Sequence, residues 1–157
     1  MDGEYEIEVS VPFPRDSDGF IRRECPHCMR QFKWHDGPAS EEAERHAPPA
    51  TYNCPLCGQP AAVDSWSTAE QVDLAQQTAM PQFMEMVQDD LEAMFRGVKG
   101  MTYTRGVDEV PDQSEPLTES DDMVIVASPC HSFEPVKVPD DHTGPLYCLV
   151  CGSAFAV

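Results

Sequence analysis

The arrangement of the seven cysteines is the feature of this 157-residue chain that most constrains its fold. Six of them form three C-x-x-C pairs, namely Cys25 and Cys28, Cys54 and Cys57, and Cys148 and Cys151. Two thiolates at this spacing can grip one metal ion from a tight turn, and two such turns complete a tetrahedral site. Short segments bury too little apolar surface to fold alone, so we expect bound metal to supply the missing stability.

The first two pairs predict one four-cysteine site. Cys25-Pro26-His27-Cys28 and Cys54-Pro55-Leu56-Cys57-Gly58 share a proline after the first cysteine, and 25 residues separate them. A single C-x-x-C also occurs in redox proteins, but two together favour a metal. The CPHC and CPLCG turns resemble those of the zinc-ribbon family, over about residues 20–63. The resemblance implies zinc held by two knuckles on β-hairpins, and no particular function.

Iron is the alternative metal at this first site. Rubredoxins use similar paired knuckles, the second often reading C-P-x-C-G, and they carry electrons through an iron ion. Here Cys28 is followed by Met29 and Arg30 instead of the usual rubredoxin Gly-Tyr, and no redox partner domain is evident. Zinc is therefore the metal that we expect.

A second metal site is predicted near the C-terminus, so we expect the chain to bind two zinc ions in all. The Cys148–Cys151 knuckle needs two more ligands, and Cys130 is the only cysteine left. His131 is the leading candidate for the fourth ligand, because the following residues 134–138 resemble the strand that leaves a first knuckle. His142 is the alternative, although its place in the turn DDHTG suits solvent better.

The pattern of the remaining chain predicts a small metal-stapled α+β fold, in which an amphipathic helix and a flexible acidic linker join two zinc-ribbon-like β modules. Alternating residues 4–11 predict a strand, which forms a hairpin with residues 20–23 after a turn at 16–19. Residues 40–45 favour a short helical turn. We expect four parts: 1–65 with the first ribbon, 66–99 as the helix, 100–122 as the linker and 123–157 as the second module.

The helix is the strongest secondary-structure signal. Ser67 and Glu70 form a capping-box pattern at its start, and Gly97 lies at its end. Apolar residues recur every three or four positions along one stripe, which includes Phe83, Val87 and Met94. Pro81 should kink the helix or divide it, because proline lacks the backbone N–H of the helical hydrogen bond.

Charge and hydropathy restrict the partners. The net charge of −18 disfavours contact with nucleic acids and with anionic membranes. We see no secretory signal or membrane-spanning run, so we expect a cytoplasmic protein in a reducing compartment. Half of the ten basic residues nevertheless lie around the first knuckle: Arg15, Arg22, Arg23, Arg30 and Lys33.

These features favour a non-enzymatic adaptor that binds proteins. Sites with four protein ligands leave the metal no open position for a substrate, and we find no nucleophile paired with a base and no phosphate-binding glycine loop. We expect a protein partner or a second copy of the chain to bind the helical stripe. A nucleic-acid-binding regulator, using the basic knuckle with Phe32, Trp34 and Tyr52 as stacking groups, is the alternative. The predicted partner-binding residues are Arg22, Arg23, Arg30, Lys33, Trp34, Phe83, Val87 and Met94.

Overall fold

The computed structural model describes residues 13–104 and 117–157. The strand predicted over residues 4–11 lies outside these ranges. The chain forms two compact units: one joins residues 13–69 to 117–157, and the other contains the long helix. The first unit holds all seven cysteines.

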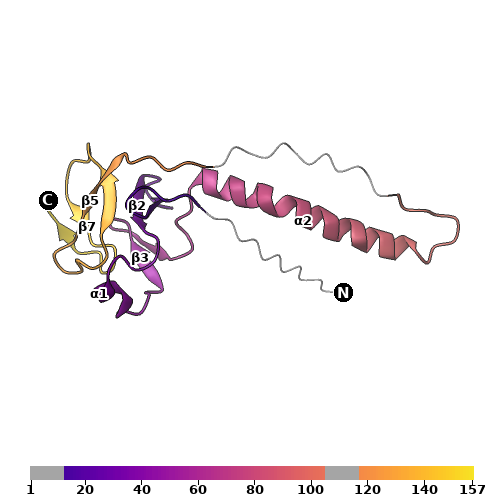
Figure 1. Ribbon diagram of the computed structural model, residues 1–157, viewed down its shortest axis with the longest axis horizontal. Coiled ribbons are helices and arrows are strands. Elements are labelled where there is room, and N and C mark those ends of the chain that lie inside the picture. The colour runs from indigo at the N-terminus through magenta and orange to yellow at the C-terminus, as the bar shows by residue number, and fades with distance from the viewer. Residues whose placement is uncertain (1–12, 105–116) are drawn as a thin grey trace. The chain divides into compact units, whose positions relative to one another are not determined.

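A four-stranded antiparallel sheet organises the first unit. Its strands are β1 (Phe20–Glu24), β2 (Gln31–His35), β6 (Val136–Pro139) and β5 (Met123–Val126), in the order β1-β2-β6-β5. Figure 1 labels β2 and β5. At its centre, Lys33 and Trp34 of β2 pair with Lys137 and Val136 of β6. The two cysteine-bearing ends of the chain therefore contribute adjacent strands to one sheet. The sequence had left the relation between the two modules undetermined.

Smaller elements carry the second and third knuckles. The strands β3 (Thr51–Asn53) and β4 (Pro60–Ala62) form one hairpin, and β7 (Leu146–Tyr147) and β8 (Ala154–Phe155) form another. The short helix α1 (Glu41–Glu44) begins where the Ser40 hydroxyl accepts a hydrogen bond of 3.2 Å from the Ala43 N–H. This helix matches the predicted helical turn.

One hydrophobic core serves both cysteine-bearing segments. Phe32 and Trp66 have no exposed surface, and Trp66 lies edge-on to Phe32 with ring centroids 5.7 Å apart. Val136 and Leu149 from the C-terminal segment belong to the same cluster as Cys25 and Cys54. The two cysteine-bearing segments thus bury their apolar side chains against one another, which neither is large enough to do alone.

The second unit contains the helix α2 (Ala69–Phe95). Its limits agree with the predicted start near Ser67 and end near Gly97. Pro81 lies inside the helix, but α2 remains one continuous element (Figure 1). Of the two outcomes expected at Pro81, a kink or a division, the division did not occur.

Candidate metal centres

The three C-x-x-C turns have the same backbone geometry. In each, the N–H of the residue after the second cysteine donates to the carbonyl of the first cysteine, at 3.0 Å for Met29 and 2.8 Å for both Gly58 and Gly152. These three residues have positive φ angles of 60°, 77° and 77°. Glycine adopts this conformation without strain, whereas Met29 does so at a steric cost.

The first knuckle and the second bring four sulfurs together. The Sγ atoms of Cys25, Cys28, Cys54 and Cys57 all lie within 4.8 Å of one another. Cys25 and Cys57 are 3.6 Å apart, and Cys28 and Cys54 are 3.9 Å apart. A tetrahedral zinc ion with Zn–S bonds of about 2.3 Å requires sulfurs about 3.8 Å apart. A disulfide would need about 2.05 Å, so the spacing fits a metal centre.

Backbone amides point at the sulfurs of this cluster. The N–H groups of His27 and Cys28 donate to Cys25 Sγ at 3.3 and 3.4 Å, and Leu56 N–H donates to Cys54 Sγ at 3.4 Å. Such bonds stabilise the thiolate form that a metal requires. Cys25 and Cys54 have no exposed surface, and burial by itself raises the pKa of Cys54. A bound cation would offset that desolvation.

The second cluster joins three cysteines to a histidine. Ligand atoms of Cys130, His131, Cys148 and Cys151 lie within 4.8 Å of one another. Cys130 Sγ is 3.5 Å from Cys151 Sγ, and His131 Nδ1 is 3.4 Å from Cys148 Sγ. Tetrahedral zinc predicts a nitrogen-to-sulfur distance of about 3.6 Å. His142 is not part of this cluster; its Nε2 lies 3.3 Å from the Pro145 carbonyl.

Hydroxyl groups support the second cluster. Ser128 Oγ donates to Cys148 Sγ at 3.1 Å and accepts from His131 N–H at 3.2 Å, so it links two of the candidate ligands. Hydrogen bonds from the side chain and backbone of Ser153 lower the pKa of Cys151 to about 6, which favours its thiolate at neutral pH. The sequence offered no signal for either serine.

The second and third knuckles are bonded to each other. Asn53 N–H donates to the Leu149 carbonyl at 2.8 Å, and Tyr147 N–H donates to the Pro55 carbonyl at 2.9 Å. A Cβ atom on Gly58 would lie 2.9 Å from the Tyr147 ring. The two candidate metal clusters are therefore neighbours within one unit, and backbone hydrogen bonds join the turns that carry them.

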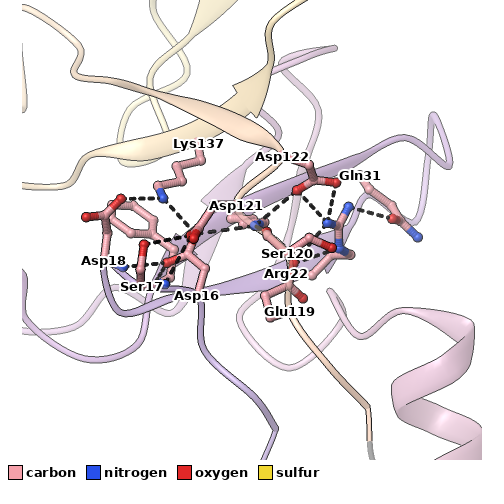
Figure 2. A network of polar contacts seen from close by, with 12 residues as sticks. Asp16, Ser17, Asp18, Arg22, Gln31, Glu119, Ser120, Asp121, Asp122 and Lys137 are labelled. Carbon is pink, nitrogen blue, oxygen red and sulfur yellow. Dashed lines mark hydrogen bonds and ion pairs between the residues drawn. The ribbon is translucent and has the colours of Figure 1, made fainter.

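Two basic residues near the first knuckle, Lys33 and Arg22, form ion pairs within the fold. Lys33 is fully buried, with its Nζ 3.0 Å from Glu119 and 3.2 Å from Asp122, and it also donates to the Ser120 carbonyl. Arg22 donates to Glu119 and Asp122 (Figure 2). The acidic end of the predicted linker thus lies against β1 and β2, since carboxylates there neutralise these cations.

Arg23 and Arg30, the other two cations among the predicted partner-binding residues, make contacts within the fold as well. The Arg23 guanidinium lies 4.9 Å from the centroid of the Trp34 ring, and Arg30 donates to the Leu56 carbonyl at 2.9 Å. Arg30 therefore fixes the first knuckle to the second. The four cations that were predicted to contact a partner are used within the fold.

On α2, the predicted partner-binding residues differ in exposure. Phe83 and Met94 are 43% and 70% exposed, whereas Val87 is half-buried. Val72 and Met80 add further exposed apolar surface to the helix. No helix among the described residues is both long and apolar enough to cross a bilayer.

A cluster of carboxylates comprises Asp16, Asp18 and Asp121. Lys137 Nζ lies 2.7 Å from both Asp16 Oδ2 and Asp18 Oδ2 (Figure 2). Lys33 Nζ also lies 3.3 Å from Asp16 Oδ2, and Asp121 accepts hydrogen bonds from Ser17, so each carboxylate already has a partner. This cluster is consequently a structural ion-pair network that sequence reasoning missed, because its members lie far apart in the chain.

Comparison of the chain with protein-family models, curated proteins and solved structures gives no match. The geometry of the two clusters is consequently the evidence from which function is argued.

Proposed function

We propose that this protein is a non-enzymatic adaptor, stapled by two zinc ions in zinc-ribbon-like modules, which binds another protein through α2. The observation that carries the proposal is the composition of the two clusters. Each provides four side-chain ligands at tetrahedral spacing, which would leave a bound ion no open coordination position. Ions of this kind are structural, and their binding free energy becomes folding free energy.

The exposed apolar surface of α2 supports the interaction role. Phe83, Met84 and Met94 are each at least 40% exposed. Methionine side chains adapt to irregular partner surfaces, and contiguous exposed apolar side chains commonly mark protein interfaces. The nucleic-acid alternative has less support, since Lys33 is buried and Arg22 is paired with carboxylates.

Metal analysis tests the structural role of the ions. We expect protein purified without added metal to hold two zinc ions per chain by elemental analysis, and to unfold when a strong chelator removes them. Red colour in the purified protein would instead indicate iron at the four-cysteine site. Metal-free protein that stays folded and equally resistant to heat would contradict the proposal.

Substitutions in α2 test the interaction. The double variant Phe83→Glu with Met94→Glu should abolish affinity capture of the partner, or dissociate a homo-oligomer in light scattering. The matched control, Gln77→Glu with Thr78→Glu, adds the same charge to exposed positions away from the stripe. Equal loss of binding in both variants would refute the assigned face.

A further inference from the structure

A cavity of about 590 Å³ lies beside the second metal cluster. Its walls come from the α1 segment, from the sheet and from the loop after His131, and all belong to the cysteine-bearing unit. The lining includes Trp34, His46, Tyr52, Phe133 and Glu134. Apart from His131, none of the lining residues belongs to a candidate metal cluster.

Aromatic rings form much of the wall. Trp34 and Tyr52 have ring centroids 5.0 Å apart, and His46 stacks on Phe133 with centroids 3.9 Å apart. Trp34, Tyr52 and Phe133 are half-buried, so their rings are partly open to a ligand. The faces of such rings carry negative partial charge and attract cations.

Glu134 adds a formal negative charge to this wall. Its side chain is half-buried, and within residues 13–104 and 117–157 its carboxylate has no hydrogen bond and no ion pair. Only its backbone N–H is bonded, to the His131 carbonyl at 3.1 Å. Burial raises the pKa of Glu134, and the imidazoles of His35 and His46, which also line the cavity, act in the opposite direction. A partly desolvated carboxylate without a hydrogen bond or ion pair is still costly, and a cation in the cavity would supply such a partner. By contrast, Asp16 and Glu119, two other carboxylates with little exposure, are both paired with lysines.

We propose that this cavity binds a lysine or arginine side chain of a protein partner. The volume lies within the range of about 300–1,000 Å³ that is typical of ligand pockets, so a long side chain fits. Exposed Pro38, Glu44 and Pro48 form part of its lining, which leaves an approach from solvent. The net charge of −18 would attract a basic segment more strongly than a single small cation. The choice of a protein as the source rests on the proposed adaptor function.

Nuclear magnetic resonance on the full-length, zinc-loaded, ¹⁵N-labelled protein tests the proposal. The probe is a short peptide whose central lysine carries its only charge. Its counterpart has norleucine in place of that lysine. In about 150 mM salt, which screens long-range attraction, the lysine peptide should shift the amide signals of Tyr52, Phe133 and Glu134 saturably. Equal shifts with norleucine would overturn the proposal, because the cation would then contribute nothing.

Glu134→Gln should weaken the affinity for the lysine peptide by about tenfold or more, which is equivalent to about 1.4 kcal/mol of binding free energy. The matched control is Glu41→Gln, which removes the same charge from α1 at a residue that does not line the cavity. The affinity of this variant for the lysine peptide should stay within about twofold of the wild-type value. Phe133→Leu, which keeps an apolar side chain but removes a ring face, should weaken binding severalfold. Equal affinities of Glu134→Gln and wild type would refute the site.

Two further readouts separate this inference from the proposed function. Butylamine should bind much more weakly than the peptide; equal affinity would overturn the assignment to a protein partner. Each variant is checked for two bound ions and unchanged thermal unfolding. If a folded, zinc-loaded protein captures its partner through α2 but ignores the lysine peptide, the cavity proposal fails while the adaptor function stands.

Discussion

Lys137 Nζ lies 2.7 Å from Asp16 Oδ2, and both residues are buried although 121 positions separate them in the chain. The same carboxylate oxygen is 3.3 Å from the Nζ of buried Lys33. Because Lys33 and Lys137 are directly paired across β2 and β6, Asp16 bridges two ammonium groups at the centre of the sheet. This contact joins the two cysteine-bearing segments independently of any metal.

Asp16→Asn should lower the free energy of unfolding by about 1.5–3 kcal/mol, because it removes the buried carboxylate that Lys33 and Lys137 share, while their other carboxylate partners remain. Although burial opposes ionisation, hydrogen bonds from Lys137, from the N–H groups of Phe20 and Asp18 and from Lys33 hold the pKa of Asp16 at about 2. A lowered carboxyl pKa stabilises the fold above about pH 4, and the contribution is lost as the pH falls towards 2. Urea unfolding of zinc-loaded protein at neutral pH therefore measures the whole effect.

The control for this measurement is the exposed Arg15–Asp36 pair, at 2.7 Å. Arg15→Gln removes an ion pair of similar length in solvent and should change stability by less than about 1 kcal/mol. If Asp16→Asn proved no more destabilising than Arg15→Gln, the buried network would not join the two segments as we argue.

His131→Ala should reduce the metal content from two ions per chain to about one, or raise the dissociation constant of one ion at least about tenfold. The physical reason is the position of His131 Nδ1, 3.4 Å from Cys148 Sγ. His142→Ala should retain both ions, since His142 lies outside the cluster. Native mass spectrometry of both variants, prepared alike, measures the stoichiometry; a reversed result would assign His142 as the ligand.

The two centres should release their ions in a defined order. Cys130 and Cys151 are exposed, whereas Cys25 and Cys54 are fully buried, so a chelator reaches the C-terminal centre first. Zinc release to a colorimetric chelator should be biphasic, with the fast phase equal to one ion. In His131→Ala the fast phase should disappear if the C-terminal ion is lost, or become faster if that ion is held more weakly. The slow phase, which reports the four-cysteine centre, should keep its rate. Slower release from the C-terminal centre would contradict the role of exposure.

Gly58→Ala should destabilise the protein by about 2–3 kcal/mol. The new methyl group would lie 2.9 Å from the Tyr147 ring at a residue whose φ is 77°. Gly37→Ala shares the positive φ but has no neighbouring atom within 4 Å, so it should cost only about 1 kcal/mol. The difference in urea midpoints between the two variants isolates the contact between knuckles. Equal effects would mean that Tyr147 moves aside freely.

Met29→Gly should stabilise the protein by about 0.5–1 kcal/mol, because it relieves a left-handed backbone conformation at an exposed position. Met101→Gly is the comparison: Met101 is also exposed but has no positive φ, so glycine there should bring no gain. Thermal unfolding of the zinc-loaded variants provides the measurement. A loss of stability in Met29→Gly would indicate that the methionine side chain contributes contacts that outweigh the strain.

Local patterns predicted much of the fold. The spacing of the cysteines indicated which residues cluster, and the periodicity of residues 67–97 indicated α2, because both signals depend on neighbours within a few positions. The alternation and turn signals near Phe20 and Ser40 likewise matched β1 and α1. Pro81 did not divide the helix, which was one of the two expected outcomes, since a local penalty of one missing hydrogen bond did not end a helix of 27 residues.

The sequence by itself determined the three C-x-x-C pairs, because such a turn positions its own sulfurs, whereas the tertiary structure placed His131, and not His142, beside Cys148. Only the tertiary structure decided how the two ends of the chain combine: β2 pairs with β6, Asp16 lies between two lysines, and the carboxylates near Glu119 neutralise the basic knuckle. Such contacts join residues about a hundred positions apart, and no local pattern encodes them. The cavity around Glu134 likewise exists only because distant aromatic side chains meet there.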